Sequence, residues 1–206
     1  MGKTVITIAR SYGSGGRTLG KLLAKELGIH YYDRELLRRA SDASGINEAL
    51  FGEVDEKLKK SPLFRIASKN YSGEVIAPDS DEFISDDNLF NYQAKVIREL
   101  AEEESCVIIG RCADYVLREF DNVIRLYFYA PKEDCIRRVK EISNEPERDI
   151  IKKIEKTDKN RAAYYKYYTG HEWNDARNYD LCLNTTSMSY EKLVEVVKNY
   201  IAVCGK

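Results

Sequence analysis

The feature that most constrains the fold is a glycine-rich loop near the N-terminus, RSYGSGGRTLG, at residues 10–20. The apolar, β-branched run TVITIA precedes it and predicts a buried parallel strand, while LGKLLAKELG follows it and predicts a helix. Glycines between a strand and a helix allow successive backbone N–H groups to surround an anion at the positive end of the helix. The arrangement indicates a phosphate-binding loop. The alternative is a tight turn that uses glycine only for its positive φ.

The loop departs from the phosphate-loop pattern G-x-x-x-x-G-K-[ST] at two positions. Ser11 stands in place of the first glycine, and Arg17 stands in place of the lysine. Arginine keeps the positive charge but is longer and forked, so its contacts differ in geometry from those of lysine. Thr18 fits the pattern, and its hydroxyl is a candidate ligand of Mg²⁺. The residues expected to bind phosphate are Gly13, Ser14, Gly15, Gly16, Arg17 and Thr18.

Strand-like and helix-like segments alternate along the rest of the chain. Apolar runs predict strands at residues 4–9, 29–32, 106–109, 123–130 and 181–184. Amphipathic runs predict a long helix capped by Asp86 or Asp87, and helices at residues 17–27, 34–44, 47–60, 113–119, 132–142, 145–168 and 190–203. Residues 62–87 have the weakest pattern and are typical of an exposed connection. The alternation predicts an α/β fold, a parallel sheet flanked by helices.

Composition indicates a globular chain of one domain and argues against several classes of partner. The 206 residues include 33 basic and 34 acidic side chains, so the net charge of −1 leaves no basic excess for nucleic acid or a membrane surface. No apolar run reaches the roughly 20 residues that cross a bilayer, and a signal-peptide layout is not seen. The five cysteines form no C-x-x-C pair and only two histidines are present. We therefore expect reduced cysteines, no zinc site and a cytoplasmic protein.

A second candidate site follows the predicted strand 29–32, where the sequence reads YYDR. The carboxyl ends of parallel strands line the crevice in which α/β proteins bind ligands. Asp33 would accept hydrogen bonds from the hydroxyl groups of an acceptor substrate, and Arg34, Arg38 or Arg39 would contact its phosphate. The alternative is that Asp33 only caps the helix that begins at residue 34.

A third candidate site follows the predicted strand 106–109, where the sequence continues with Gly110 and Arg111. A guanidinium at the end of a buried strand can bind a phosphate through two hydrogen bonds. The alternative is a surface arginine at a strand end. Asp114 lies one turn into the next predicted helix, where it would contact the substrate or pair with a neighbouring arginine.

The charged segment EPERDIIKKIEKTDKNR is a candidate lid. Most segments of this composition are solvated helix faces, and that is the alternative here. A lid would bring arginines over the transferring phosphate and exclude water. Arg161 is the first candidate, followed by Arg137 and Arg148.

Together these segments resemble the cytidylate kinase-like proteins, bacterial relatives of cytidylate kinase within the nucleoside monophosphate kinase group. The resemblance covers nearly the whole chain apart from residues 62–87 and keeps the order of GSGGRT, YYD, VIIGR, FYAPKEDCIRRV, DKNRAAYY and YDLCLNT. Members of this branch commonly carry GSGGR. Cytidylate kinase itself has lysine at the position of Arg17 and aspartate at that of Cys112.

The resemblance implies a P-loop fold with five parallel strands, an acceptor-binding region at about residues 33–95 and a lid at about residues 143–170. It also implies transfer of the γ-phosphoryl group of ATP, with Mg²⁺ on Thr18, to a nucleoside monophosphate, with CMP or dCMP as the expected acceptor. No general base is required, because the accepting phosphate oxygen is already ionised. The expected catalytic residues are Arg17, Arg111 and Arg161, and the expected acceptor-binding residues are Asp33, Arg38, Arg111 and Asp114.

Two alternatives remain open from the sequence. Cys112, in place of the aspartate of cytidylate kinase, is compatible with a non-nucleotide metabolite as the acceptor. Arg17 and the unmatched residues 62–87 are compatible with a nucleotide-binding regulatory module that has little catalysis. Oligomeric state is not predicted.

Overall fold

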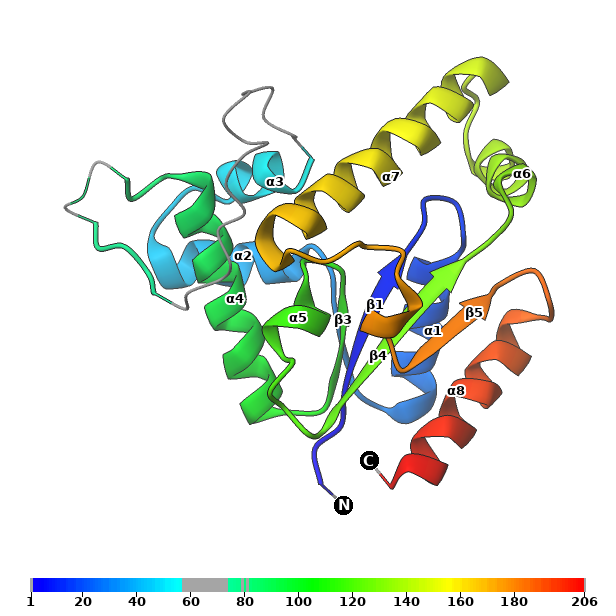
Figure 1. Ribbon diagram of the computed structural model, residues 1–206, viewed down its shortest axis with the longest axis horizontal. Coiled ribbons are helices and arrows are strands. Elements are labelled where there is room, and N and C mark those ends of the chain that lie inside the picture. The colour runs from blue at the N-terminus through cyan, green and yellow to red at the C-terminus, as the bar shows by residue number, and fades with distance from the viewer. Residues whose placement is uncertain (1, 57–73, 79, 81, 206) are drawn as a thin grey trace.

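The computed structural model describes residues 2–56, 74–78, 80 and 82–205, and within them five parallel strands form one sheet (Figure 1). β1 lies in the middle and pairs with both β3 and β4, so the loop that follows β1 sits at the centre of the carboxyl edge of the sheet. The predicted α/β fold is confirmed. The strands are β1 (Val5–Arg10), β2 (His30–Tyr32), β3 (Cys106–Ile109), β4 (Val123–Tyr129) and β5 (Leu181–Asn184), in the order β2-β3-β1-β4-β5.

Successive residues of the central strands point to opposite faces of the sheet, and each face is covered by helices. Ile6 and Ile8 of β1 pack against α1 (Gly16–Leu27) and α8 (Tyr190–Cys204). Val5 belongs to the core of the other face. That face is covered by α2 (Glu35–Ser44), α3 (Glu48–Glu56), α4 (Asp86–Glu103) and α5 (Ala113–Val116).

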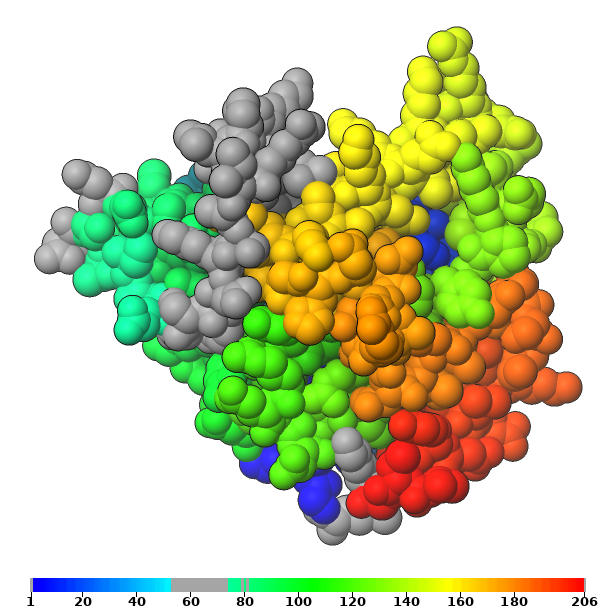
Figure 2. Space-filling model, viewed as in Figure 1, coloured from blue at the N-terminus to red at the C-terminus, as the bar shows by residue number. Residues whose placement is uncertain are grey.

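The long helix α7 (Glu147–Thr169) crosses the carboxyl edge of the sheet (Figure 1). Its first half packs on α6 (Lys132–Ile142) through Ile150 and Ile154. In its second half, Tyr168 stacks on Phe90 of α4 with the ring centroids 3.9 Å apart. The helix therefore bridges both sides of the molecule. Figure 2 shows atoms of the N-terminal part of the chain, in blue, in a hollow between α7 and α6.

Several predicted boundaries differ from the observed ones. The predicted long helix is α4, and its N-terminal cap is Ser85, whose hydroxyl accepts from the N–H of Asn88 at 3.3 Å. Asp86 and Asp87, the predicted caps, lie in the first turn, where their negative charge interacts favourably with the helix dipole. The helix predicted at 113–119 ends at Val116. As predicted, Asn47 lies at the start of α3, where its side-chain oxygen accepts a hydrogen bond from the N–H of Ala49. Of the predicted helix 47–60, residues 57–60 lie outside the described residues, as do many of residues 62–87.

The α7 to β5 connection contains the short 3₁₀ helix η2 (Ala176–Asn178). Within the described residues, no helix is long and apolar enough to span a bilayer.

Candidate active site

The loop after β1 curls because two of its glycines take left-handed backbone angles. Gly13 has φ +79° and Gly15 has φ +82°. A Cβ on Gly15 would lie 2.1 Å from the hydroxyl oxygen of Tyr190, so a side chain is excluded there for steric as well as conformational reasons. Ser14 turns inward, and its hydroxyl donates to the carbonyl of Ser11 at 2.8 Å. The loop is thus folded tightly against the protein.

The start of α1 leaves several backbone donors available. Gly15 is the N-terminal cap and has no side chain to accept from the first turn, which also contains no acidic residue. Within the described part of the chain, no hydrogen bond is donated by the N–H groups of Gly13, Gly15, Arg17 and Thr18. Unsatisfied N–H groups at the positive end of a helix are the donors that bind phosphate in proteins. The loop therefore has the chemistry of an anion site.

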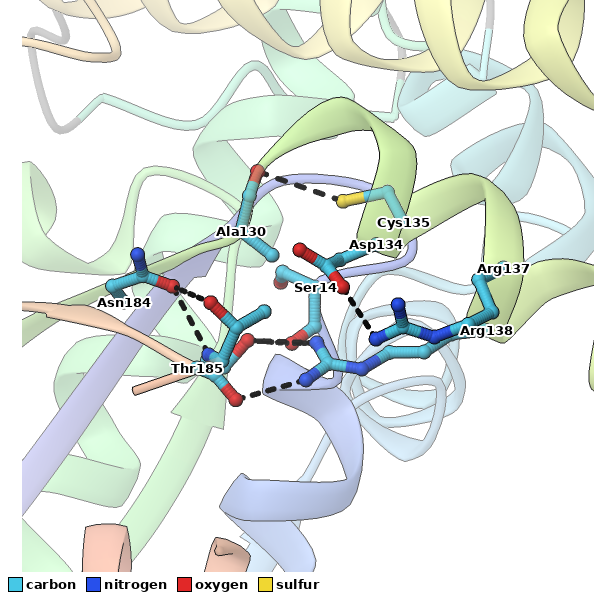
Figure 3. A network of polar contacts seen from close by, with 9 residues as sticks. Ser14, Ala130, Asp134, Cys135, Arg137, Arg138, Asn184 and Thr185 are labelled. Carbon is cyan, nitrogen blue, oxygen red and sulfur yellow. Dashed lines mark hydrogen bonds and ion pairs between the residues drawn. The ribbon is translucent and has the colours of Figure 1, made fainter. Parts of the chain in front are cut away.

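A buried polar network fixes the backbone of the loop from α6 and the end of β5 (Figure 3). The carbonyl oxygen of Ser14 accepts from the Arg138 guanidinium at 2.8 Å and from the Thr185 hydroxyl at 2.6 Å. The same guanidinium also donates to the hydroxyl and the carbonyl oxygen of Thr185, each at 2.8 Å. Sequence reasoning did not single out Arg138 or Thr185. The Arg137–Arg138 pair on a helix next to the sheet is the only signal that the sequence offers.

Asp33 pairs with two arginines instead of capping a helix. Its carboxylate lies 2.7 Å from Nε of Arg17 and 3.7 Å from a terminal nitrogen of Arg111. The cap position of α2 is Arg34, and no side chain caps the helix. The capping alternative is therefore wrong, because the two guanidinium groups compete successfully for the carboxylate. Arg17, the predicted cation of the loop, reaches toward the end of β2.

The turn after β3 holds three successive residues in left-handed conformation. Gly110, Arg111 and Cys112 have φ values of +70°, +55° and +53°. Such angles are uncommon outside glycine and cost of order 1–3 kcal/mol for each non-glycine residue, so the surrounding structure must impose them. The turn carries the buried guanidinium of Arg111, which donates to the carbonyl of Ile109 at 3.2 Å. Cys112 is buried at the start of α5.

Helix α7 attaches directly to the loop. The carboxylate of Asp158 accepts from the N–H of Tyr12 at 2.8 Å and from Arg161 at 3.3 Å. Arg161 also donates to the carbonyl of Arg10 at 3.1 Å, and its guanidinium lies 5.7 Å from the centre of the Tyr12 ring. Burial raises the pKa of Asp158 and lowers the pKa of Arg161. The site therefore includes Asp158 and Tyr12, which sequence reasoning did not assign.

The other predicted lid arginines do not join this group. Arg137 pairs with Asp134 on its own helix. It lines a hollow of about 470 Å³ between α6 and the start of α7, together with Glu133, Ile136, Lys140, Glu141 and Glu147. Arg148 is exposed near the start of α7.

Arg38 and Asp114, which were predicted to bind the acceptor, contact other protein side chains in the structure. Arg38 is largely exposed on α2, 3.9 Å from Glu35. Asp114 is buried, and its carboxylate accepts from the Tyr165 hydroxyl of α7 at 2.6 Å. Burial raises the pKa of Asp114 to about 6, although the bond from Tyr165 opposes the increase. The contact joins the segment after Arg111 to α7.

Arg10, the last residue of β1, completes the site and was not predicted. Its charge is close enough to those of Arg161, Arg111 and Arg17 to be affected by each of them. We refer to these four residues, Arg10, Arg17, Arg111 and Arg161, as the arginine cluster. The cluster joins the ends of β1 and β3, the start of α1 and the middle of α7. Within the described residues, no group of three His, Cys, Asp or Glu side chains is arranged to hold a metal ion.

Comparisons with known proteins agree with this architecture. The cytidylate kinase of Methanopyrus kandleri is 26% identical over 203 residues, which cover 94% of this chain and 91% of the relative. A crystal structure of an uncharacterized protein from Eubacterium ventriosum has a TM-score of 0.72 and 25% identity and covers 97% of this chain and 99% of its own. The shikimate kinase of Bacteroides thetaiotaomicron shares the fold, with a TM-score of 0.54, 15% identity and coverage of 97% and 98%. Residues 5–187 match the cytidylate kinase-like family, so the predicted kinase class is confirmed and the chain belongs to that family.

Proposed function

We propose that the chain transfers the γ-phosphoryl group of ATP to a nucleoside monophosphate, CMP or dCMP, in the cytoplasm. The observation that carries the proposal is the contact between Arg17 and Asp33. Arg17 belongs to the loop with unsatisfied N–H groups, whereas Asp33 and its second partner Arg111 follow neighbouring strands. A donor phosphate on the loop and an acceptor beside Asp33 would therefore meet at the arginine cluster.

The donor would be bound by the loop from Gly13 to Thr18. Its free N–H groups would hydrogen-bond the phosphates of ATP, and the start of α1 would favour their negative charge. Thr18 is exposed on the first turn of α1, where its hydroxyl would hold Mg²⁺ together with the phosphate oxygens. When bound, Mg²⁺ would neutralise charge on the transferring phosphate. Thr18 would supply only one protein ligand, which suits a metal ion that is held mainly by the phosphates of the nucleotide and binds together with it.

The acceptor would lie in the region of residues 33–95, with Asp33 and Arg111 facing the monophosphate and Arg38 at its edge. Residues 143–170 would act as a lid, from which Arg161 reaches the loop. The guanidinium groups would offset the negative charge of the two phosphates and would stabilise the charge that develops during the transfer. Asp114 would contribute by holding α5 against Tyr165 of α7.

A coupled ADP-release assay across the nucleoside monophosphates tests the proposal. We expect turnover with CMP or dCMP, and Thr18→Ala should lower kcat by on the order of 10²-fold, the scale for loss of one transition-state contact. Thr18→Ser retains the hydroxyl and should keep most of the activity, which makes it the matched control. Turnover with none of the monophosphates, in a protein that still binds ATP with Mg²⁺, would overturn the nucleotide assignment.

Cys112 is the observation that favours a second candidate function, with a phosphorylated non-nucleotide metabolite as the acceptor. Its side chain is buried at the start of α5 and offers no carboxylate to hydrogen-bond the nucleobase of a nucleotide acceptor. The same assay with phosphorylated sugars and acids as acceptors would identify this case. Stabilisation by ATP with Mg²⁺, without transfer to any acceptor, would instead indicate a regulatory module.

A further inference from the structure

The side chain of Arg10 runs along the carboxyl edge of the sheet, from β1 toward β3. Two glycines make room for it. A Cβ on Gly16 would lie 2.6 Å from Cβ of Arg10, and a Cβ on Gly110 would lie 2.3 Å from one of its terminal nitrogens. The stem of Arg10 therefore lies against Gly16 at the start of α1, and its guanidinium lies against Gly110 in the turn after β3.

The carboxylates near the arginine cluster are engaged by other groups. Asp33 pairs with Arg17 and Arg111, and Asp158 accepts from Arg161 and from the N–H of Tyr12. Within the described part of the chain, no carboxylate lies within 4 Å of the Arg10 guanidinium. Burial and the charge of Arg161 lower the pKa of Arg10 to about 9. Arg10 is thus a cation in an unfavourable environment.

Among the described residues, the carboxylates of Asp33 and Asp158 pair with Arg17, Arg111 and Arg161, and Arg10 is the fourth cation of the cluster. A phosphate dianion has the charge opposite to that of Arg10, and its oxygens match the forked donors of arginine. Arg17, the residue expected to supply the cation of the loop, is drawn toward Asp33 instead.

We infer that Arg10 binds a substrate phosphate directly and supplies the positive charge beside the loop that lysine supplies in other phosphate loops. This inference rests on the proposed function for the identity of the substrate. The phosphate belongs either to the acceptor monophosphate or to the γ-position of the donor, and the two have the same chemistry.

Thermal unfolding of Arg10→Met tests the inference. Methionine keeps the unbranched stem and removes the charge, so the ligand-free variant should unfold at a temperature no lower than that of the wild type. The increase in Tm that inorganic phosphate produces in the wild type should disappear. Apparent Kd values for phosphate should rise about 10- to 100-fold, the scale of a hydrogen bond to a charged group. Arg98→Met is the matched control, because Arg98 is a half-buried arginine that contacts Phe120 and the carbonyl of Val116.

Steady-state kinetics identify the source of the phosphate. A larger increase in the KM of CMP than in that of ATP assigns the acceptor phosphate to Arg10, and the reverse assigns the donor phosphate. If Arg10→Met does not fold, Arg10→Gln decides, because glutamine keeps a polar end on the side chain but removes the charge: a raised Kd for phosphate supports the inference and an unchanged Kd overturns it.

A purely structural role gives a different result. Arg10→Met would then unfold at a lower temperature and would bind inorganic phosphate, CMP and ATP as the wild type does, which overturns the inference. The outcome is separable from the proposed function. If no nucleoside monophosphate is turned over but inorganic phosphate stabilises the wild type and not Arg10→Met, the inference stands and the proposed acceptor does not.

Discussion

Replacing Asp114 by asparagine should make the stability of the folded protein decrease less as pH rises. The carboxyl group is buried between α5 and α7, and the groups that face it are Tyr165, Arg125 and Tyr179. Burial raises its pKa from 3.8 to about 6, so the folded state favours the protonated form. The stability that this group contributes is complete below pH 3.8 and is lost as pH rises through about 6. A shift of about two pH units corresponds to about 3 kcal/mol.

The measurement is the free energy of unfolding in urea, for the wild type and Asp114→Asn, at several pH values between about 4 and 8. Asparagine cannot ionise, and its carbonyl oxygen can still accept from the Tyr165 hydroxyl. We expect the stability of the variant relative to the wild type to increase by about 3 kcal/mol across this range. Asp121→Asn, at an exposed position, should give no such trend. A relative stability that stays constant or falls as pH rises would refute the reasoning.

Two further predictions concern the loop and its attachment to α7. Gly15→Ala should lower the Tm in thermal unfolding by more than Gly28→Ala does. Both positions have positive φ, but only a Cβ at residue 15 meets Tyr190. Equal decreases in Tm would contradict the steric argument. Asp158→Ala should cost about 1–3 kcal/mol in urea unfolding, because it leaves the N–H of Tyr12 without its acceptor, and a neutral effect would show that the bond contributes nothing.

The fold and the centre of the site could be predicted because their determinants are local in sequence. A buried strand, three glycines and a helix follow one another within residues 4–27, and Asp33 and Arg111 each follow a strand. In a parallel sheet the ends of neighbouring strands meet at one edge, so local patterns were enough to place these groups near one another.

The remaining features depend on contacts between distant parts of the chain. A carboxylate at a helix start looks the same whether it caps the helix or pairs with Arg17 and Arg111, so the sequence left the role of Asp33 open. The sequence predicted that Asp114 contacts the substrate or pairs with a neighbouring arginine, but its carboxylate accepts from Tyr165 of α7, which is distant in the chain. Arg10 was overlooked because it ends an apolar strand; a charge at that position, directly before a glycine-rich loop, was the available signal.

The bond between Tyr12 and Asp158 makes one backbone amide of the loop depend on α7. Any movement that lifts this part of α7 from the loop must break the bond and expose the amide to solvent. Hydrogen–deuterium exchange at that single position therefore records how often the helix separates from the loop. The Tyr12 amide therefore gives a readout of opening that needs no substrate.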